Sequence, residues 1–276
     1  MKLDLCIWTK NGAKTLLPVL KRVEEVIPDE EVWKKIAVDD SSTDNTVEIL
    51  KEFNWKIYQN YEGFINGGTN EALKHVETEF FVSIEQDVLL SPKWWDVVPD
   101  HMKDEKVAVA QGIELSTNKA ERALEKLKVK RLKQIPFEER SKMWFSIGNN
   151  IYRSGIIKKL GFVDDPVAMG PFYKKVMSRR FKWITDVNVV STHLHGNLFD
   201  AISHTVRFYE LTRQRTDIDN MSLLRYFAGV AASPLKGFTL SITSKEPIVQ
   251  FFYPLKRLAL TPTYFRRRQK LYLDTR

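Results

Sequence analysis

The chain has 276 residues, of which 43% are hydrophobic and 28% charged, a composition that excludes a disordered, collagenous or coiled-coil protein. Its length predicts about two domains, or one large α/β domain with an appendage, and its single cysteine, Cys6, excludes an intramolecular disulfide and suits a reducing compartment. The net charge of +8 is concentrated in a basic tail, because seven basic residues and one acid lie between Lys256 and Arg276.

Short apolar runs of β character alternate with segments of helical spacing through the first half of the chain. Strands are predicted at residues 3–8, 32–38, 55–59, 79–84 and 107–111, and helices at 16–27, from 43 to about 53, at 69–76 and after Pro92. Gly63, Gly67 and Gly68 are expected in a loop. The alternation predicts right-handed crossovers and a mainly parallel α/β sheet, whose ligands lie beyond the carboxyl ends of its strands.

The second half opens with a charged helical stretch and ends in a helical region. The predicted elements are a helix from 119 that ends near Pro136, a mixed strand or loop at 144–153, helices at 154–160 and 171–180, an extended segment at 183–193, and then helices broken at Pro234, Pro247, Pro254 and Pro262. We therefore expect an α/β domain over residues 1–197 and a helical, basic and aromatic region over residues 198–276.

The tail predicts a surface contact with a polyanion. No early apolar run has the features of a signal peptide, and no stretch approaches ~20 uninterrupted apolar residues. Aromatic side chains interleave with the basic cluster, which favours an anionic membrane surface; the alternative is a helical cap with its basic face in water. We expect a cytoplasmic protein, peripheral at the inner face of the cell membrane, and no nucleic-acid partner.

Two adjacent carboxylates, Asp39 and Asp40, leave the second predicted strand just before a helix. One of them can accept hydrogen bonds from a nucleobase N–H or a ribose hydroxyl, while the other braces the loop. The alternative is a helix-capping turn, because Asp and Ser are common in such turns. By itself this motif leaves both interpretations open.

Acids and histidines follow two later strands. Glu85 and Asp87 can both reach one divalent cation, because hard cations take carboxylate oxygens; two solvated acids are the alternative. His193 and His195 face the same side of an extended segment, so both imidazoles can point into one site, unless they are surface histidines. The sequence contains no phosphate-binding Gly-Lys-Ser/Thr loop and no Gly-x-Ser-x-Gly elbow.

The order and spacing of these segments carry more information than any one of them. The relevant residues are Leu5–Gly12, Ala37–Thr46, Asn60–Phe64, Asn70 and Glu85–Asp87. Together they resemble the family 2 glycosyltransferases, over roughly residues 1–195, and Val38–Asp44 is the most specific part. The resemblance implies a GT-A fold, a nucleotide-binding α/β sheet, and hexosyl transfer from a UDP- or GDP-linked sugar to a lipid-linked or glycan acceptor.

The resemblance also implies roles for individual residues. Donor binding falls to Thr9, Asn11 and Asp39, supported by Asp40, Asn70 and Gln86. Asp87 is expected to bind Mn²⁺ or Mg²⁺, with Glu85 in place of the family's usual first aspartate. His193 or His195 is expected to be a further metal ligand, later in the chain. Such a cation stabilises the diphosphate that leaves the sugar, and direct displacement inverts the anomeric carbon.

The general base is where the sequence departs from the family pattern. No acid occupies the segment Pro166–Tyr173, so the nearest candidates are Asp164 and Asp165, which an acidic turn before Pro166 explains equally well. An acceptor that is already anionic, such as a polyprenyl phosphate, would need no protein base. Two other function classes stay open: a catalytically inactive GT-A module that binds a nucleotide sugar or a partner protein, and a nucleotidyltransferase, which Thr9–Gly12 matches poorly.

Overall fold

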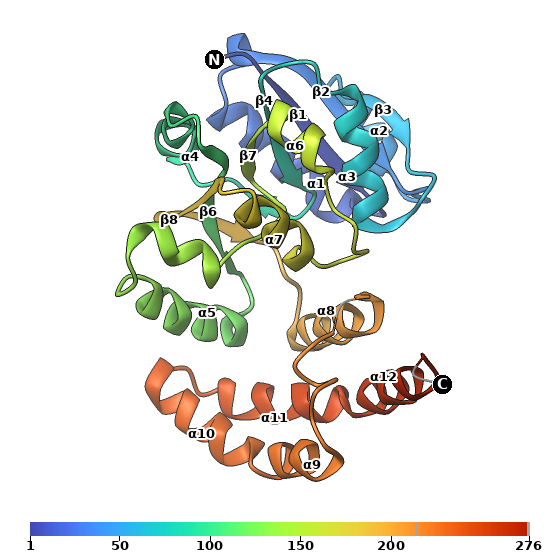
Figure 1. Cartoon of the computed structure of the whole chain (residues 1–276), viewed down its shortest axis with the longest axis vertical. Helices are drawn as coiled ribbons and strands as arrows, with labels where there is room; N and C mark the ends of the chain where they lie inside the picture. The colour runs from blue at the N-terminus through green and yellow to red at the C-terminus, as the bar shows by residue number, and fades with distance from the viewer. Residues whose placement is uncertain (214, 275–276) are drawn as a thin grey trace. The chain divides into compact units, whose positions relative to one another are not determined.

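The computed structural model describes residues 1–213 and 215–274, with the backbone alone for residues 271–274. Arg276 of the predicted basic tail lies outside the described residues. The chain divides into two compact units, one of Met1–Leu115 and Arg131–Leu194 and one of Ser116–Lys130 and His195–Arg276 (Figure 1). Residues 116–130 group with the C-terminal helices in the second unit.

The first unit is built on one sheet. Its strands are β1 (Leu3–Thr9), β2 (Val32–Asp39), β3 (Lys56–Gln59), β4 (Phe80–Glu85), β5 (Val88–Leu89), β6 (Val107–Ser116), β7 (Asn150–Arg153) and β8 (Lys182–His193), in the order β3-β2-β1-β4-β7-β6-β8-β5. The strands β3, β2, β1 and β4 pair in parallel, whereas β7 pairs antiparallel with β4 and β6, and β5 with β8. This arrangement confirms the predicted α/β class.

Helices bury both faces of the sheet. The first unit contains α1 (Ala13–Val26), α2 (Thr46–Glu52), α3 (Phe64–His75), α4 (Trp94–Val97), α6 (Ser154–Leu160), α7 (Gly170–Ser178) and three short 3₁₀ turns at Asp29–Glu31, Pro99–Lys103 and Phe137–Lys142. Alternate residues of β1 enter different cores, because Leu5 and Ile7 pack with α1 while Cys6 and Trp8 pack with α3. A strand buried on both faces reads as the continuous apolar run seen in the sequence.

The helix α3 begins earlier than the sequence predicted. Gly67 and Gly68 were expected in a loop, but they lie inside α3, which starts at Phe64. A Cβ at Gly68 would lie 2.6 Å from the Cβ of Trp8, and one at Gly67 would lie 2.2 Å from Oδ1 of Asn60. The glycines therefore permit close packing of the helix on β1, which outweighs their poor helix propensity.

The second unit is helical. It contains most of α5 (Lys119–Leu132), together with α8 (Leu198–Leu211), α9 (Leu223–Ala231), α10 (Ser233–Ser244), α11 (Val249–Ala259) and α12 (Thr261–Asp274). Ala120 and Ala123 of α5 share a core with α8 and α11, which explains why this segment leaves the first unit. Among the helices in the described part of the chain, none combines the length and apolar character that a membrane crossing requires.

Proline positions explain most of the helix boundaries in the second unit. Pro234 lies in the first turn of α10 and Pro262 in the first turn of α12, where a missing N–H costs nothing. The predicted break at Pro254 is wrong, because α11 runs through it. Pro254 has no N–H to donate to the carbonyl of Gln250, four residues earlier in the helix. That carbonyl oxygen lies close to Gly237 of α10, since a Cβ at Gly237 would be 2.8 Å from it.

Candidate active site

Three neighbouring strands end at one edge of the sheet, and most of the predicted site residues follow them. Thr9 of β1 is in register with Asp39 of β2, and Trp8 is in register with Glu85 of β4. Neighbouring strands lie about 4.8 Å apart, so the ends of β2 and β4 are about 10 Å apart across β1. Asp39 and the acids after β4 therefore border one edge, at a separation that suits the two ends of a nucleoside diphosphate.

Asp39 is held by a buried hydrogen-bond network. Its Oδ1 accepts hydrogen bonds from Thr9 Oγ1 at 2.8 Å and Ser42 Oγ at 2.6 Å, and its Oδ2 accepts one from Ser42 N at 2.8 Å. A carboxylate offers about four acceptor positions, so these bonds fix its orientation and leave capacity for one more donor. Such a donor can come from a nucleobase or a ribose.

Asn11 and Asp40 shape the loops beside that network. Asn11 adopts a left-handed backbone with φ of 48°, and its Oδ1 accepts a hydrogen bond from Thr43 N at 2.8 Å, which joins the loops after β1 and β2. Asp40 forms an ion pair with Lys10 Nζ at 2.9 Å and accepts a bond from Phe64 N at 3.3 Å. Both side chains therefore brace the loops beside Asp39 in this structure.

Gln86 fastens the loop after β4 to the loop after β1. Its Oε1 accepts a hydrogen bond from Lys10 N at 2.9 Å, and its Nε2 donates to Lys10 O at 3.2 Å. A Cβ at Gly12 would lie 2.5 Å from Oε1 of Gln86, so the glycine makes room for this contact. The clamp fixes the turn that carries the neighbouring acids.

Asp87 and His193 come together through an antiparallel pairing. Val88 of β5 pairs with His193 of β8, and Leu194 N donates to Asp87 O at 2.7 Å. These backbone contacts place Nε2 of His193 3.4 Å from Oδ2 of Asp87. Burial alone would lower the pKa of His193, but its hydrogen bond to Asp87 and the charges of Asp87, Glu114 and Glu85 raise this pKa to about 10.

Glu85 and Glu114 make this edge strongly acidic. Burial, followed by the charges of Glu114 and Asp87, raises the pKa of Glu85 to about 8. A Cβ at Gly148 would lie 2.4 Å from the carboxyl carbon of Glu85, so the acid occupies space that only a glycine leaves open. Asn149 orients Glu114, because Nδ2 of Asn149 donates a hydrogen bond to Oε1 of Glu114 at 3.1 Å.

The chemistry of this cluster fits a hard divalent cation. Carboxylate oxygens with one imidazole suit Mn²⁺ or Mg²⁺. The charges of Glu114 and Asp87 repel a charged Glu85 and raise its pKa, and a bound cation would reduce this repulsion. Within residues 1–213 and 215–274, no group of three or more His, Cys, Asp and Glu side chains is arranged to hold a metal ion. Asp87 would supply a carboxylate ligand to such a cation, and His193 would supply a nitrogen ligand once its ring has lost its proton.

The other predicted site residues have different contacts. His195 belongs to the second unit, where its Nδ1 pairs with Glu121, and we leave it out of the Asp87–His193 cluster. Asn70 donates from Nδ2 to Val163 O at 2.8 Å, so it anchors the loop before α7. Asp164 pairs with Lys175, and buried Asp165 accepts bonds from Val167 N and Ala168 N at 3.1 and 2.9 Å. Both acids serve the local loop here.

Three functional candidates escaped the sequence analysis. Ser42 supplies two of the bonds to Asp39 but was treated only as part of a motif. Glu114 lies in the apolar strand β6, where a lone acid could have been noticed. The importance of Gly148 lies in its distance from Glu85 in space, which the sequence alone does not give.

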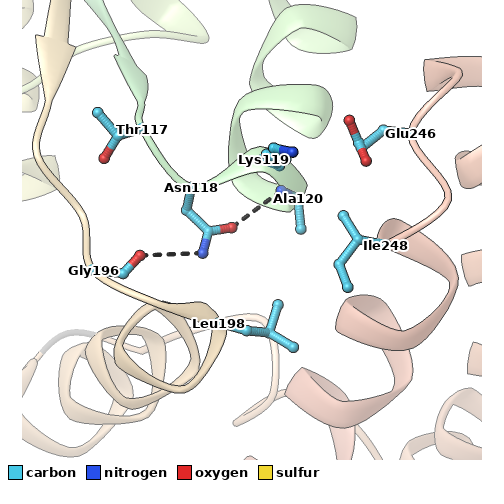
Figure 2. A pocket seen from close by; sticks show the side chains of 8 residues that line it. All are labelled: Thr117, Asn118, Lys119, Ala120, Gly196, Leu198, Glu246 and Ile248. Atoms are coloured by element: carbon cyan, nitrogen blue, oxygen red, sulfur yellow. Dashed lines mark hydrogen bonds between the residues drawn. The ribbon is translucent and has the colours of Figure 1, made fainter.

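The second unit carries a separate cavity of about 470 Å³ (Figure 2). It is lined by Thr117, Asn118, Lys119, Ala120, Gly196, Leu198, Glu246 and Ile248. Asn118 organises its rim, with Nδ2 donating to Gly196 O at 3.4 Å and Oδ1 accepting from Ala120 N at 3.1 Å. None of the predicted site residues lines it, so the sheet edge remains the candidate active site.

A comparison with protein-family models identifies the sequence pattern. The model described as Glycosyl transferase family 2 matches residues 4–161, which include all of β1 except Leu3, the strands β2 to β4, Asp87 and Gly148. A comparison with curated proteins gives no match to this chain.

Solved structures confirm the predicted GT-A fold. A mannosyltransferase from Pyrobaculum calidifontis, in complex with GDP-Man and Mn²⁺, is 15% identical, with a TM-score of 0.63 over 97% of this chain and 87% of that chain. Glucosyl-3-phosphoglycerate synthase from Mycobacterium tuberculosis, in complex with Mg²⁺ and UDP, is 13% identical, with a TM-score of 0.56 over 76% of this chain and 77% of that chain. The same synthase in complex with Mn²⁺, UDP and glucosyl-3-phosphoglycerate is 13% identical, with a TM-score of 0.53 over 76% of this chain and 78% of that chain.

Proposed function

The chain belongs to glycosyl transferase family 2, and we propose that it transfers a sugar from a UDP- or GDP-linked donor, with Mn²⁺ or Mg²⁺, to a lipid-linked or glycan acceptor. The pairing of Asp87 with His193, at the same sheet edge as the Asp39 network, is the observation that carries the proposal. The structural neighbours, solved with GDP-Man or UDP and with Mn²⁺ or Mg²⁺, support the choice of donor and cation.

Different residues along the sheet edge have different proposed roles, one group in nucleoside binding and another in cation binding. Asp39, oriented by Thr9 and Ser42, accepts a hydrogen bond from the nucleoside. Asp87 and His193, beside Glu85, would hold the cation, and Gln86 keeps the turn that carries Asp87 bonded to Lys10 on the nucleoside side. When bound, the cation would supply Lewis-acid stabilisation of the negative charge on the leaving diphosphate. Displacement by the acceptor from the opposite face inverts the anomeric carbon.

The engagement of the two candidate bases favours an anionic acceptor. Asp164 is paired with Lys175, and Asp165 bonds to the backbone of its own loop, so neither is presented as a base in this structure. A phosphate oxygen is already a nucleophile and needs no proton removed. A polyprenyl phosphate therefore fits better than a neutral hydroxyl, and it places the enzyme peripherally at the cytoplasmic face of a membrane.

The proposal is tested with donors and acceptors on the purified full chain. UDP-, GDP- and TDP-sugars are screened by thermal shift with and without Mn²⁺; one donor is expected to raise the melting temperature with the cation only, because ligand at about 100 times its Kd adds about 2.7 kcal/mol. The selected donor is then offered to polyprenyl phosphate and to a free alcohol. No shift with any donor would refute the proposed donor site, and transfer to the alcohol alone would refute the anionic acceptor.

Gly148→Ala is expected to damage the acidic edge without unfolding the protein. The new methyl group would overlap the Glu85 carboxyl, which must move, so we expect at least about a tenfold rise in the Mn²⁺ concentration needed for half-maximal activity. Gly155→Ala is the matched control, because nothing lies within 4 Å of a Cβ at that position of α6. Equal metal dependence in both variants would contradict the role of Gly148.

A further inference from the structure

The helix α10 has its small residues inside and its large apolar residues outside. It buries Ser233, Gly237 and Ser241, at i, i+4 and i+8. In contrast, Leu235 and Ile242 are 72% and 63% exposed, and Phe238 is exposed between them. A helix on the surface of a globular protein normally places its large apolar side chains toward the core. This helix has the opposite arrangement.

Close packing on α11 accounts for the buried side of α10. A Cβ at Gly237 would lie 2.8 Å from Gln250 O, so small residues are needed where the helices cross. Three hydroxyls of α10 donate to carbonyls of their own helix: Thr239 Oγ1 to Leu235 O at 3.0 Å, Thr243 Oγ1 to Thr239 O at 2.8 Å and Ser241 Oγ to Phe238 O at 2.7 Å. These groups therefore do not depend on water for a partner.

The preceding helix α9 also exposes large apolar side chains. Leu224 is 83% exposed, and Leu223 and Phe227 are also exposed. Figure 1 draws α9 and α10 in succession, joined at Ala232, and the ring of Phe227 lies 6.1 Å from that of Phe265 in α12. We call the side chains of Leu223, Leu224, Phe227, Leu235, Phe238 and Ile242 the α9–α10 apolar set. A monomeric soluble protein rarely exposes so many large apolar groups on adjacent helices.

The charged residues within α9 and α10 are of one sign. Residues 223–244 include Arg225 and Lys236 and no carboxylate, and Nζ of Lys236 lies 5.2 Å from the ring centroid of Tyr253 in α11. The helices α9 and α10 have 9 and 12 residues, about 14 and 18 Å in length, whereas a bilayer core is about 30 Å thick. Apolar side chains with cations on short helices suit the interface of an anionic bilayer, into which the helices insert without crossing.

We propose that α9 and α10 dock the protein on an anionic lipid bilayer by inserting the α9–α10 apolar set into the interface, with Arg225 and Lys236 contacting the headgroups. The absence of carboxylates from residues 223–244 favours a lipid surface over a protein partner, which would supply mixed charge. The inference adds a membrane-binding surface to the proposed function. It rests on that function only for one consequence, which is that the enzyme meets its lipid-linked acceptor at this surface.

Vesicle flotation of the full chain tests the docking. The probes are vesicles of phosphatidylcholine alone and of phosphatidylcholine with phosphatidylglycerol, without donor or acceptor, so the outcome is independent of the donor thermal shift. We expect flotation with the anionic vesicles, and a loss of at least about tenfold in the Leu224→Gln/Leu235→Gln/Ile242→Gln variant. Leu17→Gln/Trp33→Gln/Met143→Gln, which changes three exposed apolar residues of the first unit, is expected to float like the unaltered protein.

The other outcomes overturn the inference. Equal flotation of the two triple variants would show that the α9–α10 apolar set is not the docking surface, provided that circular dichroism shows both variants folded. Binding that is equal on neutral and anionic vesicles would refute the role of Arg225 and Lys236. Failure to float, with a concentration-dependent dimer that the C-terminal triple variant abolishes, would assign the surface to a second copy of this chain.

Discussion

Replacing Asp87 by asparagine is expected to lower kcat/KM for sugar transfer at least about 100-fold while the protein stays folded. The amide keeps the size of the side chain but removes the charge that faces His193 at 3.4 Å and that the proposed cation would neutralise. The fold should tolerate this change, because Asp87 lies in a turn, and its carbonyl still accepts the bond from Leu194 N. Initial rates at saturating Mn²⁺, together with a melting curve, measure both parts.

Two further variants give this result a specific meaning. Asp100→Asn is the matched control, since its side chain is exposed and pairs with Lys103 on the same 3₁₀ turn; we expect an unchanged rate. His193→Ala should cost about as much as Asp87→Asn, and the double variant little more, because groups that act as a unit are not additive. An Asp87→Asn enzyme with near-normal rate and metal dependence would remove the acid from the proposed site.

The sequence was informative where chain order and strand ends determine position. Thr9, Asp39 and Asp87 follow apolar runs that could only be strands, and parallel strands align their carboxyl ends at one edge. The α/β class and this polar edge were therefore predictable from periodicity and spacing. The roles of these residues in donor and cation binding remain predictions.

Contacts between distant segments were not predictable in the same way. Gly148 matters because it borders Glu85 across the sheet, and Glu114 because Asn149 orients it, and neither relation has a local signal. The early start of α3 has the same cause: two glycines unfavourable for a helix are kept because Trp8 and Asn60 approach them. Packing at these positions overrides propensity.

The second unit shows the limit of composition as a guide. Its basic and aromatic residues predicted a surface contact, but several of the cations hold the unit together. Arg267 binds Asp219, and Arg266 pairs with Glu210. The exposed apolar side chains of α9 and α10 lie upstream of the basic cluster that attracted attention in the sequence. Only the structure separates cations used inside the fold from side chains that remain exposed.

Arg267→Ala is expected to destabilise the second unit by about 3–5 kcal/mol, the usual cost of leaving a buried charge without its partner. Nε and Nη2 of Arg267 bind the two oxygens of Asp219 at 2.7 and 2.6 Å, and the Asp219 side chain is only 1% exposed. Nη1 also donates to Tyr209 O and Thr212 O, so the residue ties α12 to the end of α8. The substitution removes all of these bonds.

Two spectroscopic signals can locate the loss. All seven tryptophans lie in the first unit, so tryptophan fluorescence follows that unit alone, whereas far-ultraviolet circular dichroism follows the helices of both. In urea, Arg267→Ala is expected to shift the circular dichroism transition that belongs to the second unit and to leave the fluorescence transition in place. Unfolding free energies within about 1 kcal/mol of the unaltered protein would contradict a stabilising role for the ion pair.

A double variant and pH separate the buried charge from the lost packing. Asp219→Asn/Arg267→Met removes both charges and keeps the apolar stem, so it should recover much of the stability that Arg267→Ala loses. Burial raises the pKa of Asp219, but bonds from Arg267 and Thr216 outweigh it and lower this pKa below the ordinary value. The contribution of the pair is therefore complete above about pH 4 and is lost as the pH falls through the lowered pKa. The difference in the free energy of unfolding between the unaltered protein and Arg267→Ala should therefore become smaller in acid. If that difference stays constant below pH ~4, the loss of stability comes from the missing contacts of the arginine stem and not from the unpaired carboxylate of Asp219.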